Sequence, residues 1–328
     1  MDLNKLLEIL KEEPAYRIKQ IKKSLFLDSI ESWQEATNLP LLLRNKLDKE
    51  FSLKIEGEVF SSKDNNAIKA LITLKDGLKT ESVLMKHKDG RNTVCVSCQV
   101  GCKMGCLFCA TGQMGFKRDL NSGEIIDQVL FFNRFLKKEK QKVTNVVFMG
   151  MGEPFLNYKE VLETIKIVKN DLSIGARKIS ISTIGIPNGI INLSEDEPQV
   201  NLAISLHAPS DKLRTEVMPA GKEYTLSKIF KAVDKYIEKT KRKVMFEYLM
   251  IDNFNDSQEQ AKELANLMKK PLYHVNLISC NPVGNFKTPS NNKINKFKEI
   301  LENQGVSVTV RYKFGRSVKG ACGQLAGK

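Results

Sequence analysis

Five of the seven cysteines in this 328-residue chain lie within a single short stretch, from Cys95 to Cys109. Three of them, Cys102, Cys106 and Cys109, have the spacing C-x3-C-x2-C. Three thiolates can hold three irons of a cubane iron–sulfur cluster, which leaves the fourth iron open to a ligand. The stretch therefore indicates a cluster that does chemistry on a bound molecule.

Two other uses of clustered cysteines need weighing. A disulfide framework is typical of short secreted chains, whereas this chain is long and shows no secretory signal. A structural zinc site needs a fourth ligand at short spacing, and the pair Cys95 and Cys98 leaves that alternative open.

The charge of the chain favours a polyanionic partner. Lysine and arginine number 52 against 38 aspartates and glutamates, which gives a net charge of +14. Charge alone does not choose RNA over DNA, and a bias toward lysine codons is the competing explanation. The sequence has no uncharged apolar run of the roughly 18 residues that a membrane span needs. We expect a soluble, cytoplasmic protein without a membrane partner.

The chain is predicted to have three parts. Residues 1–50 form a small helical domain, because leucines such as Leu3, Leu6 and Leu10 recur at helical spacing. Its lysine-rich face is either a solvated surface or an RNA-binding accessory surface. Residues 51–97 form a β-rich connecting segment, with strands at 67–74, 80–85 and 93–96.

Residues 98–328 form the third part, in which helices and strands alternate. This alternation indicates an α/β fold of about six parallel βα units, as a partial or a full barrel. Helices are predicted at 123–138, 158–172, 226–240, 257–269 and 292–303, and strands at 145–149, 178–182, 199–205, 243–250, 273–278 and 306–311.

Polar residues follow several of these strands, where barrel active sites lie. Each is a weak signal by itself. A Gly-x-Gly-Glu turn can simply connect a strand to a helix, and His207 can be a hydrogen-bonded histidine at the edge of the core. Together with the cysteine loop they predict a polar ring around one metal site. Glu153 would accept from an ammonium group, and serine or asparagine would bind ribose or adenine. The set is Gly152, Glu153, Ser182, Ser205, His207 and Asn281.

Several motifs in a fixed order identify a family. Besides the cluster cysteines they are Cys95-Val-Ser-Cys-Gln-Val-Gly-Cys102, Met149-Gly-Met-Gly-Glu-Pro154, Ser180-Ile-Ser-Thr-Ile-Gly185, Ser205-Leu-His207, His274-Val-Asn-Leu-Ile278 and Ala321-Cys-Gly-Gln-Leu-Ala-Gly327. Over nearly its whole length the chain resembles the RlmN/Cfr family of RNA methyltransferases, in the radical S-adenosylmethionine (SAM) superfamily. The resemblance implies a partial (βα)6-type radical SAM barrel, preceded by a small helical domain and a short β extension.

The resemblance also implies roles for individual residues. Cys322 would carry a methyl group, Cys95 would be the second catalytic cysteine and Glu81 the general base. Cys98 competes with Cys95 for its role, and a strand carboxylate such as Glu81 would otherwise be expected simply to face outward. A [4Fe–4S] cluster would be held by Cys102, Cys106 and Cys109, and SAM by Gly152, Glu153, Ser182, Ser205, Leu206, His207 and Asn281.

The implied reaction uses two SAM molecules per turnover. One methylates Cys322, and the second is cleaved to a 5′-deoxyadenosyl radical that takes a hydrogen from this methyl group. The resulting methylene radical adds to adenine, and Glu81 removes the ring proton. Cys95 then attacks the Cys322 sulfur, which releases the RNA and leaves a disulfide.

The resemblance implies adenine targets in 23S rRNA, at the peptidyl transferase centre, and in some tRNAs, 3′ of the anticodon. Pro154 favours C2 methylation, as in the RlmN branch, over a Cfr-like C8 methyltransferase. We expect a monomer that receives electrons from a donor such as flavodoxin or ferredoxin. The alternatives are a radical SAM enzyme for a small molecule and a non-catalytic RNA-binding metal-cluster protein, against which Cys322 argues.

Overall fold

The computed structural model describes residues 1–11, 13–311 and 315–327. Its centre is a ten-stranded sheet with the strand order β1-β2-β3-β4-β7-β8-β9-β10-β11-β12. The strands are β1 (Glu56–Ser61), β2 (Ala67–Thr73), β3 (Lys79–Lys86), β4 (Asn92–Val96), β7 (Asn145–Phe148), β8 (Ile179–Thr183), β9 (Asn201–Ser205), β10 (Val244–Met250), β11 (Tyr273–Ser279) and β12 (Val308–Val310).

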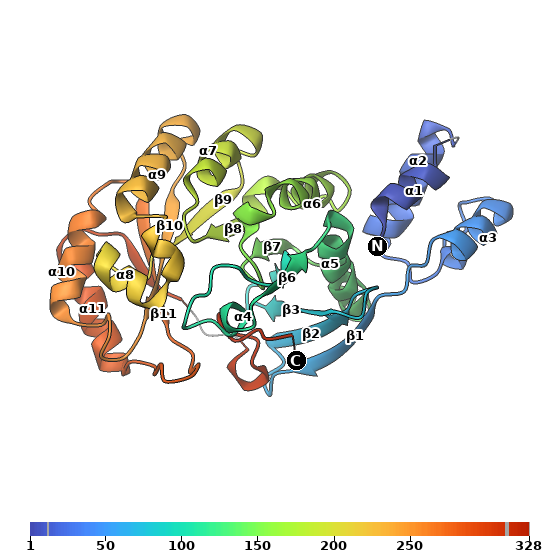
Figure 1. Cartoon of the computed structure of the whole chain (residues 1–328). Helices are drawn as coiled ribbons and strands as arrows, with labels where there is room; N and C mark the ends of the chain where they lie inside the picture. Colours follow the sequence, from blue (N-terminus) through green and yellow to red (C-terminus); the bar gives the residue numbers. More distant parts are fainter. Residues whose placement is uncertain (12, 312–314, 328) are drawn as a thin grey trace.

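From β4 to β12 all neighbouring strands are parallel, and helices cover the outside of this curved sheet (Figure 1). The strand order begins at β1 and ends at β12 without closing, so the barrel is partial, as expected. The helices between strands are α5 (Ser122–Lys137), α6 (Tyr158–Asn170), α7 (Pro187–Asp196), α8 (Asp211–Val217), α9 (Leu226–Thr240), α10 (Gln258–Leu267) and α11 (Asn291–Asn303).

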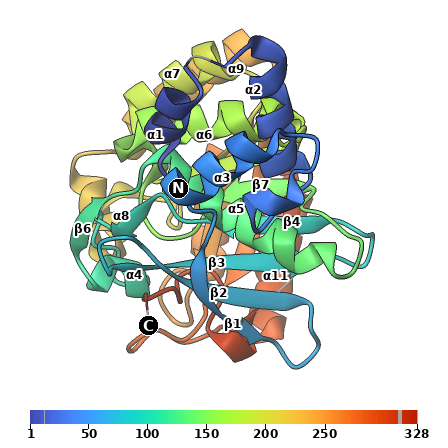
Figure 2. The ribbon, with the colours of Figure 1, turned by 90° about the vertical axis from the view of Figure 1, so that its right-hand side faces the viewer.

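Strands β1 to β4 pair antiparallel and extend the sheet to one side, where Figure 2 shows them side by side. Strands β2, β3 and β4 lie where strands were predicted, at 67–74, 80–85 and 93–96. Strand β1 was not predicted, because all six of its side chains are exposed and show no alternation between buried and exposed positions.

The N-terminal helices α1 (Leu3–Ile9), α2 (Ala15–Lys22) and α3 (Leu41–Glu50) lie beside α5, at one side of the molecule (Figure 1). The buried Trp33 donates its indole N–H to the Phe51 carbonyl at 2.8 Å. Arg134 of α5 donates to the carbonyls of Ile30 and Leu53, at 2.7 and 2.8 Å. These helices share one continuous apolar core with the barrel.

A small hairpin frames the cysteine loop. It consists of β5 (Gln99–Gly101) and β6 (Phe116–Asp119), with the short helix α4 (Ala110–Gln113) between them. Gly101 has a φ of +78°, and a Cβ there would lie 1.9 Å from the Gly115 carbonyl oxygen, so only glycine fits. None of the described helices has the length and apolar character needed to cross a bilayer.

Candidate active site

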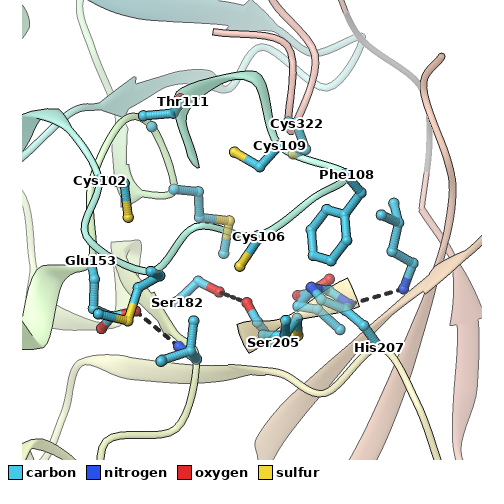
Figure 3. A pocket seen from close by; sticks show the side chains of 18 of the residues that line it. Cys102, Cys106, Phe108, Cys109, Thr111, Glu153, Ser182, Ser205, His207 and Cys322 are labelled. Carbon is cyan, nitrogen blue, oxygen red and sulfur yellow. Dashed lines mark hydrogen bonds between the residues drawn. The ribbon is translucent and has the colours of Figure 1, made fainter. Parts of the chain in front are cut away.

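The side chains of Cys102, Cys106 and Cys109 face one cavity beyond the carboxyl ends of β7, β8 and β9 (Figure 3). The loop that carries them is held in place by backbone hydrogen bonds. The Cys109 amide donates to the Cys106 carbonyl at 3.1 Å, and the Leu107 amide donates to Val217, at the end of α8, at 2.9 Å. The predicted convergence of the three thiols is therefore present.

Glu153 lies across this cavity from the cysteines and is 3% exposed. Its carboxylate accepts from the amides of Phe155 and Ile184, at 3.1 and 2.9 Å. Burial raises the pKa of this carboxyl to about 7, although these hydrogen bonds act in the opposite direction. A ligand ammonium group would favour its ionised form. The turn before Glu153 requires glycine at position 152, because its φ is +102° and a Cβ there would lie 2.6 Å from the Gln99 Cβ.

Three further predicted residues line the same cavity. The hydroxyls of Ser182 and Ser205 are 3.3 Å apart, on neighbouring strands. The Nδ1 atom of His207 accepts from the Leu249 amide at 3.0 Å, so Nε2 carries the ring hydrogen. Burial, followed by the nearby Arg214 charge, lowers the pKa of His207 to about 3. The ring is therefore neutral and offers one N–H donor.

Two predicted SAM contacts are placed differently. Leu206 is fully buried in the main core, and its side chain is not part of the cavity lining in the described structure. Asn281 lines a neighbouring cavity, where its side-chain amide donates to the Cys322 carbonyl at 3.0 Å. The SAM roles of these two residues stay predictions.

The neighbouring cavity brings Cys95 and Cys322 together, although 226 positions separate them in the sequence. Cys322 also lines the first cavity, beside Cys109 in Figure 3, so it lies between the three loop cysteines and Cys95. Burial raises the pKa of Cys95 to about 12; the charge of Cys322 adds to this rise, and that of Arg311 opposes it. All seven cysteines are free thiols.

Cys98, the competing candidate for the second catalytic thiol, points elsewhere. Its sulfur donates to the Met151 carbonyl at 3.7 Å, and its side chain packs into the main core. Across the described residues it lines neither of the two cavities. The geometry therefore favours Cys95 for this role.

Glu81, the predicted general base, is 1% exposed on β3 and does not face outward. One carboxylate oxygen accepts from the Lys69 ammonium group at 2.5 Å. The other accepts from the amides of Ala326 and Gly327, at 2.6 and 3.1 Å. In the described part of the chain Glu81 lines neither cavity, and its role as base stays a prediction.

Comparison with known proteins agrees with this site. Residues 96–302 match the model of the radical SAM superfamily. A protein of Carboxydothermus hydrogenoformans is 46% identical over 100% of this chain and 98% of its own length. A protein of Dictyoglomus thermophilum is 44% identical over 99% of this chain and 94% of its own length. Both are named as probable dual-specificity RNA methyltransferase RlmN. The chain belongs to the RlmN family.

A solved structure extends the likeness to the whole fold. A radical SAM methyltransferase from Sphaerobacter thermophilus has a TM-score of 0.95 and 40% identity, over 100% of this chain and 98% of that one. As a member of the RlmN family, this chain is a radical SAM methyltransferase that uses a [4Fe–4S] cluster and SAM.

The loop cysteines fit such a cluster. Among the described residues, no three cysteine, histidine or carboxylate side chains lie close enough to share one metal ion. Thiolates that each bind a separate iron of a cubane lie farther apart than ligands of one ion. Burial raises the pKa of Cys102 to about 12 and also raises that of Cys106. Iron must therefore displace the protons from these thiols.

We expect the variants Cys102→Ala, Cys106→Ala and Cys109→Ala each to lose bound iron and SAM cleavage together, because each thiolate is predicted to hold one iron. Iron and sulfide analysis after anaerobic reconstitution, with the cluster absorbance, measures the loss. The matched control is Cys98→Ala, which removes a neighbouring core thiol and should keep the cluster. A full cluster in any of the three variants would show that its ligand assignment is wrong.

Three charged residues of the site were not predicted. Arg214 of α8 is fully buried and donates to the carbonyls of Leu206, Tyr224 and Ile184, so it ties together loops at the strand ends. Glu247 of β10 lines the first cavity, and its Oε2 has no hydrogen-bond partner among the described residues. Arg311 lies 3.6 Å from that oxygen and lines both cavities.

Proposed function

We propose that this RlmN-family enzyme methylates C2 of adenine in RNA, with Cys322 as the carrier of the methyl group. The position of Cys322 is the main support. It borders the cavity of the three loop cysteines on one side and the cavity of Cys95 on the other. A thiol that first accepts a methyl group and later exchanges with a second thiol needs access to both.

The chemistry explains why a carrier is required. Adenine C2 is an electron-poor ring carbon without a lone pair, so it does not attack the methyl carbon of a sulfonium by itself. Cys322 is exposed and lies beside the first cavity, where its thiolate would attack the methyl carbon of SAM and release S-adenosylhomocysteine. When bound, the cluster and a second SAM supply the radical chemistry that turns this methyl group into a methylene able to add to C2.

The remaining steps use side chains of the chain. Loss of the C2 proton needs a base, for which Glu81 is the candidate. Addition of the methylene radical also leaves one unpaired electron on the adduct, and the cluster, when bound, would accept it. Cys95 would then attack the Cys322 sulfur, so that the sulfur–carbon bond breaks and the carbon takes up a proton to become the methyl group. The resulting disulfide needs reduction before the next turnover. Cys95 is suited to this exchange because it shares a cavity with Cys322.

SAM is expected in the first cavity. Glu153 would accept hydrogen bonds from its ammonium group, and the neighbouring hydroxyls of Ser182 and Ser205 would bind the ribose. The neutral His207 would contribute an N–H donor from Nε2. The buried Oε2 of Glu247 lies 3.6 Å from Arg311 and accepts no hydrogen bond among the described residues, so Glu247 adds a second acceptor in the same cavity.

The RNA target follows from the names of the relatives, dual-specificity RNA methyltransferases, together with the net charge of +14. We propose 23S rRNA and tRNA as substrates, with cytoplasmic localisation, a monomeric state and a small electron-transfer protein as reductant. C8 methylation of the same adenine is the second candidate. Pro154 in the Met-Gly-Met-Gly-Glu-Pro turn favours C2.

Residues 1–50 are proposed to contact RNA through a limited surface. This segment contains nine lysines and arginines and nine aspartates and glutamates, so the excess positive charge of the chain lies elsewhere. Lys19 and Lys23, one turn apart at α2, are both exposed. They are the residues through which these helices would bind phosphate groups.

The double variant Lys19→Glu, Lys23→Glu is expected to weaken RNA binding several-fold and to flatten its salt dependence by about one to two units of slope. Binding measured across a salt series gives both values. The double variant Lys231→Glu, Lys235→Glu makes the same charge change at exposed positions on α9 and should have less effect. An unchanged slope in the first variant would show that its lysines are only solvated.

The experiment that tests the function is mass spectrometry of rRNA and tRNA from cells that lack this gene. We expect loss of 2-methyladenosine and its return when the gene is restored, but no return with the Cys322→Ala variant. Loss of 8-methyladenosine instead would select the C8 candidate. Unchanged levels of both nucleosides would refute the proposed function.

A further inference from the structure

The segment that carries Cys322 is held by residues from three distant parts of the chain. The Ala110 amide, at the start of α4, donates to the Gly323 carbonyl at 2.8 Å, and the Thr111 hydroxyl donates to the Leu325 carbonyl at 2.7 Å. Asn281, in the loop after β11, donates to the Cys322 carbonyl at 3.0 Å. These contacts fix residues 322–325 but do not reach the last two described residues.

The third anchor is Glu81. Its Oε2 accepts from the amides of both Ala326 and Gly327, while its Oε1 is paired with Lys69. A buried carboxylate that accepts three such hydrogen bonds forms strong, charge-assisted interactions. Leu325 is also buried, beside Val83 of the same strand, so the whole end of the segment is fastened to β3.

The same contacts occupy the atoms that a general base would use. Both carboxylate oxygens of Glu81 already accept hydrogen bonds, and Glu81 lines neither cavity in the described part of the structure. In this arrangement Glu81 holds the carrier segment and does not face the place where RNA would react. Proton removal at C2 would first require the release of Ala326 and Gly327.

We propose that Glu81 is a positioning residue, which anchors the segment at Ala326 and Gly327 and so holds Cys322 between the two cavities. This inference rests on the proposed carrier function of Cys322. It assigns Glu81 a task in the first half of the reaction, the methylation of Cys322. A residue that acts solely as base at C2 has no part in that half, because no RNA is present.

A positioning role and a role solely as base predict different effects of Glu81 on the methylation of Cys322, and this difference can be measured. Methylation of Cys322 by SAM is measured without RNA, by peptide mass spectrometry of demethylated, reconstituted enzyme. Hydrogen exchange of residues 315–327, measured before SAM is added, reports on docking of the segment independently of activity. The wild-type protein serves as the reference, and its failure to methylate Cys322 would refute the proposed function itself.

We expect Glu81→Ala to speed exchange at residues 326–327 about tenfold or more and to slow methylation of Cys322 by a similar factor. Glu81→Gln keeps an oxygen that can accept from the same amides, so it should retain most of the docking and methylation. It should nevertheless fail with RNA, since an amide cannot take the C2 proton. This split between the two variants separates positioning from proton transfer.

Two more variants keep the result interpretable. Ala326→Pro removes the donor of the 2.6 Å hydrogen bond and leaves Glu81 and Lys69 in place. Ala326→Pro should show the same slow methylation as Glu81→Ala. It therefore tests the proposal even if Glu81→Ala does not fold. The control Glu197→Gln changes another buried glutamate that is paired with a lysine, Lys169, at 2.7 Å, and should leave both measurements unchanged. Normal methylation and normal exchange in Ala326→Pro, or in a folded Glu81→Ala, would overturn the proposal.

Discussion

Replacement of Cys95 by alanine is expected to stop turnover with RNA covalently joined to Cys322. The methylene bridge between the sulfur and the adenine forms without Cys95, but the sulfur–carbon bond has no thiol to break it. The adduct should appear as a protein band of higher mass, which nuclease treatment returns to the normal position. Cys98→Ala is the matched control, because its thiol lies in the core and lines neither described cavity.

The pH dependence of adduct release in the wild-type enzyme follows from the same thiol. Burial raises the pKa of Cys95 to about 12, so near neutral pH it is a thiol and not the reactive thiolate. The thiolate fraction below the pKa grows about tenfold with each pH unit. Release should therefore accelerate as the pH rises from 7 to 9, in a single-turnover chase.

Adduct accumulation in Cys98→Ala, with normal turnover in Cys95→Ala, would show that Cys98 and not Cys95 is the second catalytic thiol.

Replacement of Cys322 by alanine is expected to abolish RNA methylation while the cluster remains. No other thiol lines both cavities among the described residues, so the methyl group has no alternative carrier. The variant should show neither a methylated cysteine nor an RNA adduct, and its iron content should equal that of the wild type. SAM cleavage without RNA products should persist at a reduced rate.

The control for this variant is Cys280→Ala, which removes a buried thiol outside the lining of either described cavity. It should retain methyl transfer. Any methylated RNA produced by Cys322→Ala would mean that the methyl group does not travel through this cysteine, whatever the product.

Local patterns predicted most of the fold. The short runs of strand-forming residues in β2, β3 and β4, separated by Asp-Gly turns, and the helical spacing of α5, α9 and α11 are properties of neighbouring residues, so they are visible in the sequence. Helix α7 was missed; it includes Gly189, a poor helix former in an interior. The short helix α8 was missed as well; its internal Arg214 is fully buried, contrary to the usual exposure of this residue type.

The candidate site likewise has a part that could be predicted from the sequence and a part that could not. The loop cysteines, Glu153 and His207 stand in short motifs or at strand ends, so their convergence could be predicted. Contacts between distant segments could not. The hydrogen bonds from Ala326 and Gly327 to Glu81 join residues about 245 positions apart, and no local pattern encodes them. The placement of Arg311 against Glu247 likewise depends on the register of β10, β11 and β12.

The most direct test of the carrier role of Cys322 is the isotope content of the product. SAM with a trideuterated methyl group is supplied over several turnovers, and the RNA nucleosides are analysed by mass spectrometry. Because one methyl hydrogen is removed while the group is on Cys322, we predict 2-methyladenosine with two deuterium atoms. Product that retains all three would contradict transfer through a methylene on Cys322, since it would show that the methyl group moves intact.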